Sequence, residues 1–266
     1  MSERRLMILK IGGSVITDKS GELSAKTQEI DRLAGEIHEA NVPNLILIHG
    51  GGSFGHPFAQ RYAIKDGYKE ESQKIGFSET HHFMTVLNGL FMDSLILHQV
   101  PAVSVTPSSC MITEKGRIKE FEDAPLMTLL RMGFTPVLYG DAVFDTSLGF
   151  TVLSGDQLVS ALAIRFNAER IIMGVDEDGV YTADPKVEKT AKMLEHLTLE
   201  ELKKLQSGLG RPTARDVTGG MLGKLAELIP AVEKAIPVTI FNATKPRFVC
   251  RVLDGEVVKG TRIEKE

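Results

Sequence analysis

Short apolar runs that stop near glycine alternate along this chain with segments of helical periodicity, and this alternation restricts the fold more than any other feature. Residues 6–11 form the first run, and residues 45–48 form the second, which is soon followed by three glycines. Continuous apolar runs of this length are typical of strands buried on both faces of a parallel sheet. The segment between them has apolar residues at the spacing of an amphipathic helix: Ile30, Leu33, Ala34 and Ile37. We therefore predict a strand–helix–strand unit, with Ser24 capping its helix and Pro43 beyond its end.

The same alternation continues through the rest of the chain. We expect further helices over residues 78–98, 123–132 and 154–166, after Thr198, and after Thr218. We expect further strands over residues 101–105, 136–139, 170–175, 238–241 and 261–263. Ser154 with Gln157, and Thr198 with Glu201, have the spacing of capping boxes. Alternating elements without a repeat or a linker predict a single α/β domain over residues 1–266, a sandwich with a mostly parallel sheet.

Composition excludes several classes of function. The chain has 31 lysines and arginines against 35 acidic residues, and its net charge of −4 argues against general binding to nucleic acid. Its two cysteines, Cys110 and Cys250, are too few for a disulfide scaffold or a cysteine-based zinc site. No apolar run approaches the ~18 residues of a membrane span, and the N-terminus does not look like a targeting segment. We expect a cytoplasmic protein without nucleic-acid or membrane partners.

Glycine-rich loops follow the first two predicted strands, at the position where ligands bind in open α/β sheets. In the first loop, Lys10 ends the apolar run and is followed by Gly12-Gly13-Ser14 and then by Lys19. A lysine at a buried strand end needs an anion or solvent for its ammonium group, and paired glycines let a ligand approach the backbone. In the second loop, residues 50–52 are successive glycines whose N–H groups can form an anion nest.

The second loop also supports a rival interpretation as a serine hydrolase. Residues 51–55 fit the G-x-S-x-G nucleophile elbow around Ser53, and residues 49–52 fit the HGGG oxyanion motif. Those hydrolases carry the two motifs on separate loops, and their triad requires a late histidine, whereas the last histidine here is His196. The pattern favours an anion-binding loop.

Two later loops add to the expected anion site. Residues 176–181 follow a predicted buried strand, and residues 216–224 open a predicted helix with Thr218 as its cap and with Lys224 in its first turns. A helix N-terminus offers free N–H groups and a positive dipole end to an anion. Glycine loops and three lysines around one sheet edge predict a polyphosphate site that is not a P-loop.

The chain as a whole resembles the amino acid kinase superfamily, and within it the isopentenyl phosphate kinases. The superfamily motifs are the first lysine–glycine loop, the D-x-D-G-[VI]-Y loop and the T-G-G-M-x-x-K helix start, and His56 after Gly-Gly-Gly-Ser-Phe-Gly points to the phosphate-acceptor branch. The resemblance rests on residues 10–14 with Lys19, on residues 49–56, and on Tyr139-Gly140-Asp141, Ser154-Gly155-Asp156, residues 176–181 and residues 216–224.

This resemblance implies an open αβα sandwich with a central, mostly parallel sheet. It also implies an ATP-dependent transfer of phosphate to isopentenyl phosphate, with residues 1–145 holding the acceptor and residues 146–266 holding the nucleotide. It implies catalytic roles for Lys10, Lys19 and His56. It assigns nucleotide contacts to Lys10, Gly12, Gly13, Ser14, Gly52, Asp176, Tyr181, Gly220 and Lys224. It assigns the acceptor phosphate to Gly51, His56 and Gly155. Mg²⁺ is expected to arrive with ATP, because the sequence shows no carboxylate cluster that would form a metal cage.

The resemblance also implies a homodimer and an apolar slot for a five-carbon tail, for which our candidates are Phe77, Phe83 and Val152. Two alternatives remain: a phosphonate kinase similar to fosfomycin kinase, and a nucleotide-binding regulator of the same fold without catalysis. The presence of Lys10, Lys19 and Lys224 argues against the regulator.

Overall fold

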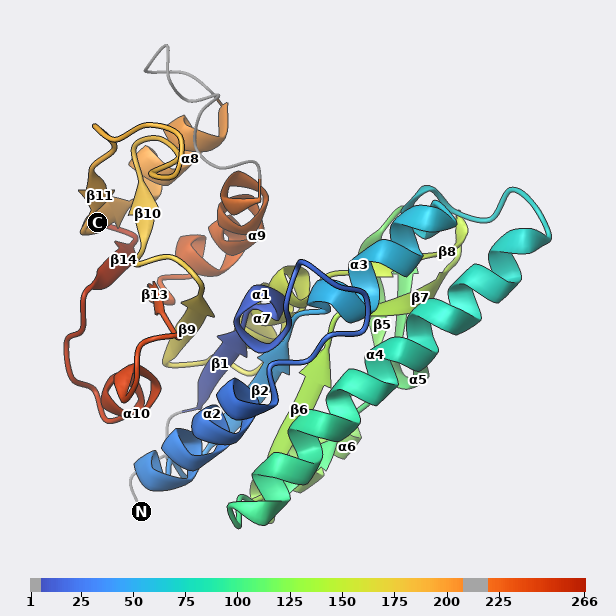
Figure 1. Cartoon of the computed structure of the whole chain (residues 1–266), viewed down its shortest axis with the longest axis horizontal. Helices are drawn as coiled ribbons and strands as arrows, with labels where there is room; N and C mark the ends of the chain where they lie inside the picture. The colour runs from blue at the N-terminus through green and yellow to red at the C-terminus, as the bar shows by residue number, and fades with distance from the viewer. Residues whose placement is uncertain (1–5, 208–219) are drawn as a thin grey trace.

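The computed structural model describes residues 6–207 and 220–266. Its main sheet has eight strands in the order β12-β14-β13-β9-β1-β2-β6-β3, and of these pairs β13–β14 is antiparallel (Figure 1). The strands are β1 (Met7–Ile11), β2 (Leu45–His49), β3 (Ala102–Ser104), β6 (Thr135–Tyr139), β9 (Arg170–Val175), β12 (His196–Thr198), β13 (Val238–Asn242) and β14 (Gly260–Glu264). This arrangement confirms the predicted α/β fold with a mostly parallel sheet.

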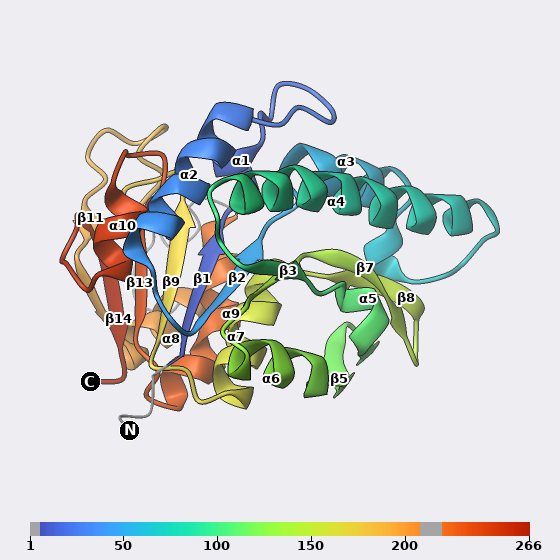
Figure 2. The same cartoon turned by 90° about the horizontal axis from the view of Figure 1, so that it is seen from below.

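Helices cover both faces of this sheet (Figure 2). One layer contains α2, α4 and α10, which share a hydrophobic core with Leu9 and Ile11 of β1. The other contains α6, α7, α8 and α9, which share a core with Ile8. The helices are α1 (Gly13–Ile16), α2 (Thr27–Ala40), α3 (Gly52–Arg61), α4 (Ser72–Leu97), α5 (Pro107–Cys110), α6 (Ala124–Arg131), α7 (Gly155–Arg165), α8 (Leu199–Ser207), α9 (Met221–Glu233) and α10 (Phe248–Leu253), with a 3₁₀ turn, η1 (Ile64–Asp66). Because strand side chains alternate between faces, Lys10 lies on the same face as Ile8 and is directed toward α7.

A second sheet of four strands, in the order β5-β4-β7-β8, was not expected from the sequence. Its strands are β4 (Met111–Glu114), β5 (Arg117–Phe121), β7 (Asp141–Asp145) and β8 (Gly149–Leu153), and a separate small pair consists of β10 (Val180–Tyr181) and β11 (Met193–Leu194). These strands do not stand out as apolar runs, because polar or charged residues interrupt them. The expected boundary between residues 145 and 146 falls in the turn that joins β7 to β8.

Several expected helix ends differ from the structure. Ser24 does not cap α2: the helix begins at Thr27 after Lys26, because Ala25 pairs with Thr17 in a short β-bridge. The long helix α4 begins at Ser72, before the expected residue 78. In the described residues, no helix has both the length and the apolar character needed to cross a membrane.

The two capping boxes differ from each other. Thr198 and Glu201 form both reciprocal hydrogen bonds at the start of α8. Ser154 accepts from the backbone N–H of Gln157 at 3.1 Å, as expected, but the Gln157 side chain binds the β4–β5 hairpin. The expected cap Thr218 lies outside the described residues.

Candidate active site

A cavity of about 700 Å³ lies at the carboxyl ends of β1, β2 and β9, where loops from distant parts of the chain meet. The predicted residues that line it are Lys10, Gly12, Gly13, Ser14, Lys19, Gly51, Gly52, His56, Val152, Gly155, Asp176, Gly220 and Lys224. The structure therefore brings together the lysines, the histidine and the glycine loops that the sequence singled out.

Lys10 is the most buried of the cavity's cations, with 3% of its surface exposed. Its Nζ lies 3.0 Å from Oδ1 of Asp156, in the first turn of α7. Burial raises the pKa of the Asp156 carboxyl, but Lys10 and Lys224 outweigh burial and hold it below its usual value. Gly155 permits this approach, because a Cβ there would lie 3.2 Å from Cε of Lys10 and 3.3 Å from the carbonyl oxygen of His49. Asp156 belongs to the motif Ser154-Gly155-Asp156, but no role for its side chain was predicted from the sequence.

Lys224 and His56 face the same cavity from α9 and α3. Burial lowers the pKa of the Lys224 ammonium, and the like charges of Lys10 and Lys19 lower it further, against the attraction of Asp156. Burial also lowers the pKa of His56, again reinforced by Lys224 and Lys10. Lys10, Lys224 and His56 thus lie close enough to influence one another around Asp156, and such a local group of cations suits the binding of an anion.

Lys19 lies at the open side of the cavity, with 70% of its side chain exposed. Its Nζ donates to Oδ2 of Asp176 at 3.2 Å. Burial raises the pKa of Asp176, but a hydrogen bond from Ser14 and the charge of Lys19 bring it below its usual value. Lys19 is therefore held at the open side of the cavity by its ion pair with Asp176.

The two glycine loops touch backbone to backbone. Gly52 has φ of +48°, and a Cβ there would lie 1.9 Å from Oγ1 of Thr17, so only glycine fits without rearrangement. Thr17 donates to the Gly13 carbonyl at 2.8 Å and accepts from the Ser53 N–H at 3.1 Å. This contact holds the two loops together where both line the cavity.

The hydrolase interpretation does not fit this geometry. Oγ of Ser53 is engaged by the Ser24 backbone, accepting from its N–H at 3.2 Å and donating to its carbonyl at 3.3 Å. His49 contacts the Gly50 carbonyl and the Asn88 side chain instead, and burial lowers its pKa to about 4. The Ser53 hydroxyl therefore orders the loop.

The apolar end of the cavity differs from the expected one. Val152 lines it, but Phe77 and Phe83 do not. Phe77 stacks on Phe144 of β7, with ring centroids 5.2 Å apart, and Phe83 packs on Phe58 of α3 at 4.3 Å. Helix α4 instead turns Thr80 and Met84 toward the cavity, and the i, i+4 spacing of these two residues is the signal that sequence reasoning missed.

Two further residues complete the description of the site. Tyr181, expected at the nucleotide, is in β10 and outside the cavity lining. Asp141, which lines the cavity, accepts from Nδ1 of His81 at 3.0 Å. Burial raises the pKa of Asp141, and the hydrogen bond to Asp141 raises the pKa of His81. His81 thus joins α4 to the start of β7.

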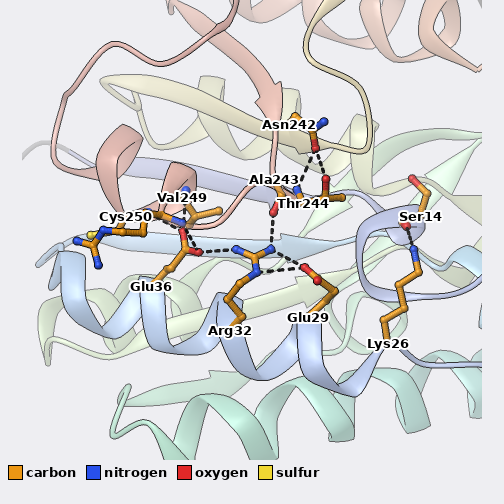
Figure 3. Close-up of polar contacts among 11 residues, drawn as sticks. Ser14, Lys26, Glu29, Arg32, Glu36, Asn242, Ala243, Thr244, Val249 and Cys250 are labelled. Carbon is orange, nitrogen blue, oxygen red and sulfur yellow. Dashed lines mark hydrogen bonds and ion pairs between the residues drawn. The ribbon is translucent and has the colours of Figure 1, made fainter.

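The edge of the site near β9 is supported by α2 (Figure 3). Arg32 donates to the Ala243 carbonyl at 2.6 Å, and the Ala243 N–H donates to the carbonyl of Val175, next to Asp176. Glu36 accepts from the backbone N–H groups of Arg247, Val249 and Cys250. A buried carboxylate and its arginine thereby hold the segment after β13 against the sheet.

Comparisons with known proteins agree with this geometry. A model of the amino acid kinase family matches residues 5–242. The isopentenyl phosphate kinase of Methanothermobacter thermautotrophicus is 41% identical, over 97% of this chain and 98% of its own length. The isopentenyl phosphate kinase of Methanocaldococcus jannaschii is 33% identical, over 97% of this chain and 98% of its own length. A solved structure of isopentenyl phosphate kinase superposes with a TM-score of 0.86 at 38% identity, covering 97% of this chain and 99% of that one.

Proposed function

The chain belongs to the amino acid kinase family, and from that premise we propose that it transfers the γ-phosphoryl group of ATP to isopentenyl phosphate, giving isopentenyl diphosphate and ADP. The observation that carries this proposal is the convergence of Lys10, Lys19, Lys224 and His56 on one cavity that also has an apolar end. Relatives of this name that are more than 30% identical along nearly the whole chain support the choice of substrate.

The chemistry needs positioning and charge neutralisation more than a general base. A phosphate monoester is already largely ionised near neutral pH, because its second pKa is about 6. One of its oxygens attacks the γ-phosphorus, the bond to the β-phosphate oxygen breaks, and ADP leaves with that electron pair. Both reactants are anionic, so transfer depends on lysines and N–H groups that align them. Lys10 and Lys19 are proposed to neutralise the transferring group.

The remaining assignments divide between the two substrates. For the nucleotide we propose Lys10, Gly12, Gly13, Ser14, Gly52, Asp176, Tyr181, Gly220 and Lys224, mainly from residues 146–266 and the first loop. For the acceptor phosphate we propose Gly51, His56 and Gly155, with residues 1–145 forming most of its site. Mg²⁺ is proposed to enter bound to ATP, as part of that substrate.

The tail of the acceptor is proposed to occupy the apolar end of the cavity. Thr80 and Met84 from α4 and Val152 from β8 line this end. Phe77 and Phe83, the other candidates from the sequence, are proposed to shape it from behind, through the aromatic packing of α4 on β7 and α3. A slot of aliphatic side chains suits a small isoprenyl group, which offers no hydrogen bonds.

An ADP-release assay over isopentenyl, dimethylallyl, butyl and geranyl phosphates and fosfomycin tests the proposal. We expect the highest kcat/KM with isopentenyl phosphate. A higher value with fosfomycin would replace it with a phosphonate kinase. ATP binding without ADP release on any acceptor would support a non-catalytic regulator.

A homodimer belongs to the same proposal and is supported by the outer face of α4. Val86, Leu90 and Leu97 are 40%, 36% and 76% exposed along one stripe of this helix, and open space lies beside Gly89. Light scattering after size exclusion tests this, with Leu90→Glu expected to give monomers. The cytoplasmic location expected from the sequence stays a prediction.

A further inference from the structure

The β4–β5 hairpin, residues 111–121, has a rigid tip close to the candidate active site. Lys115 and Gly116 form its two-residue turn with φ of +52° and +76°, and Glu114 pairs with Arg117 across it. Positive φ at both turn residues is typical of a type I′ hairpin. The buried carboxylate of Asp145 accepts from the N–H of Lys115 at 3.1 Å and of Gly116 at 2.8 Å. The backbone next to Arg117 is therefore held in place, which fixes the point from which its side chain extends.

The tip is bound to α7 by Gln157. Its Oε1 accepts from the Ile118 N–H at 3.0 Å, and its Nε2 donates to the Gly116 carbonyl at 3.0 Å. Gln157 directly follows Asp156, the partner of Lys10. The hairpin thus binds the first turn of the helix that places Asp156 in the cavity.

The same tip is bound to α9 by Arg117. Its Nη1 and Nη2 lie 2.7 and 2.9 Å from Oε1 and Oε2 of Glu227. A bidentate arginine–carboxylate pair fixes orientation as well as distance. Glu227 follows Lys224 by three residues, so the two are neighbours on the surface of α9. This pair also joins residues 1–145 to residues 146–266.

We propose that the β4–β5 hairpin is a strap that holds α7 and α9 at the spacing that Asp156 and Lys224 require, and that Arg117 and Glu227 are positioning residues for Lys224. Lys224 needs such support, because Lys10 and Lys19 repel it across the cavity and oppose the attraction of Asp156 and Asp176. Without the strap, this repulsion would move the start of α9 outward. The proposal rests on the proposed function only in assuming that Lys224 contacts the phosphates of ATP.

The test compares Arg117→Gln and Glu227→Gln with matched controls that lose one charge from the same elements. Lys119→Gln removes a cation from β5 that pairs within the hairpin, and Glu233→Gln removes an anion from the far end of α9 that pairs with α8. We expect each strap variant to raise KM for ATP and lower kcat, by about threefold to tenfold in kcat/KM, with KM for isopentenyl phosphate unchanged. The controls should match the wild type.

The double variant Arg117→Glu/Glu227→Arg should recover at least half of the kcat/KM that the single variants lose. The conservative variant Arg117→Lys should recover less, because an ammonium group cannot form the bidentate contact of a guanidinium. Circular dichroism checks that each variant folds. Strap variants that equal their controls, or a loss that falls on KM for isopentenyl phosphate, would overturn the proposal. If the wild type binds ATP but does not phosphorylate isopentenyl phosphate, the proposed function fails. Calorimetric ATP affinity of the same variants then tests the strap separately.

Discussion

The Nζ of Lys10 and the Oδ1 of Asp156 lie 3.0 Å apart, although Lys10 is near the end of the central strand β1 and Asp156 is in the first turn of α7, far along the chain. Both are shielded from solvent, with side-chain exposures of 4% and 18%. This ion pair fixes the ammonium group of Lys10 at the wall of the cavity in which the two phosphates are proposed to meet.

Replacing Asp156 with asparagine should therefore cost both stability and activity. A buried lysine that loses its partner typically destabilises a protein by about 3–5 kcal/mol. We expect a loss near the lower end of that range by urea unfolding, and a fall in kcat of at least about tenfold. Asp123→Asn, which removes the partner of Arg165 at the other end of α7, is the matched control. Equal stability of the two variants would contradict this role of Asp156.

Lys19→Ala should separate catalysis from stability. Its ion pair with Asp176 is largely exposed, so we expect the free energy of unfolding to change by less than about 0.5 kcal/mol. Turnover should nevertheless fall by about tenfold to a hundredfold, because a charge that acts mainly in the transition state affects kcat. Steady-state kinetics with both substrates measures this. An effect confined to KM would show that Lys19 binds the ground state.

His56 should make acceptor binding depend on pH. Burial and neighbouring lysines lower its pKa in the free protein, so the ring is neutral at pH 7. A bound phosphate dianion favours the protonated ring, so we expect binding to take up protons and KM for isopentenyl phosphate to rise with pH. Calorimetry in two buffers of different ionisation enthalpy measures the uptake. His56→Asn should raise KM and abolish the uptake; equal uptake by the variant would exclude His56 as its source.

The apolar end of the cavity predicts how chain length can be changed. Val152→Ala should raise kcat/KM for geranyl phosphate relative to isopentenyl phosphate, by about threefold or more, because it removes two methyl groups from the cavity wall. Phe77 packs behind this wall, so Phe77→Ala should lower the free energy of unfolding, by up to about 5 kcal/mol, and should leave the ratio of the two kcat/KM values nearly unchanged. A ratio that follows Phe77 instead would place the tail deeper between α4 and β7.

Two glutamates of α2 should differ sharply in their effect on stability. Glu36 is buried and accepts from three backbone N–H groups, whereas Glu39 is exposed and pairs with the Arg247 side chain. We expect Glu36→Gln to lower the free energy of unfolding by about 2–3 kcal/mol, and Glu39→Gln by less than about 1 kcal/mol. Urea unfolding of both variants gives the comparison. Equal losses would show that the contacts of Glu36 in Figure 3 contribute little.

Much of the main sheet could be predicted, because most of its strands are short, mostly apolar runs that can be recognised from the local sequence. Residues 6–11 and 170–175 are continuous apolar runs, and the structure makes both of them buried neighbours at the centre of the sheet. The β4–β5 and β7–β8 hairpins could not be found in this way, because charged or polar residues interrupt the apolar ones in their strands, as in Arg117–Phe121 and Asp141–Asp145. No continuous apolar run therefore marks them.

The sequence by itself determined the chemistry that is available: lysines and a histidine beside glycine loops, each loop following a strand. Only the tertiary structure decided which of these groups face one another. Strand alternation directs Lys10 to one face of the sheet, but the path of the chain between strands brings α7, and with it Asp156, onto that face. The same path left Phe77 behind the cavity wall and brought Met84 into it. Such contacts join residues far apart in the chain, and no local pattern of residues encodes them.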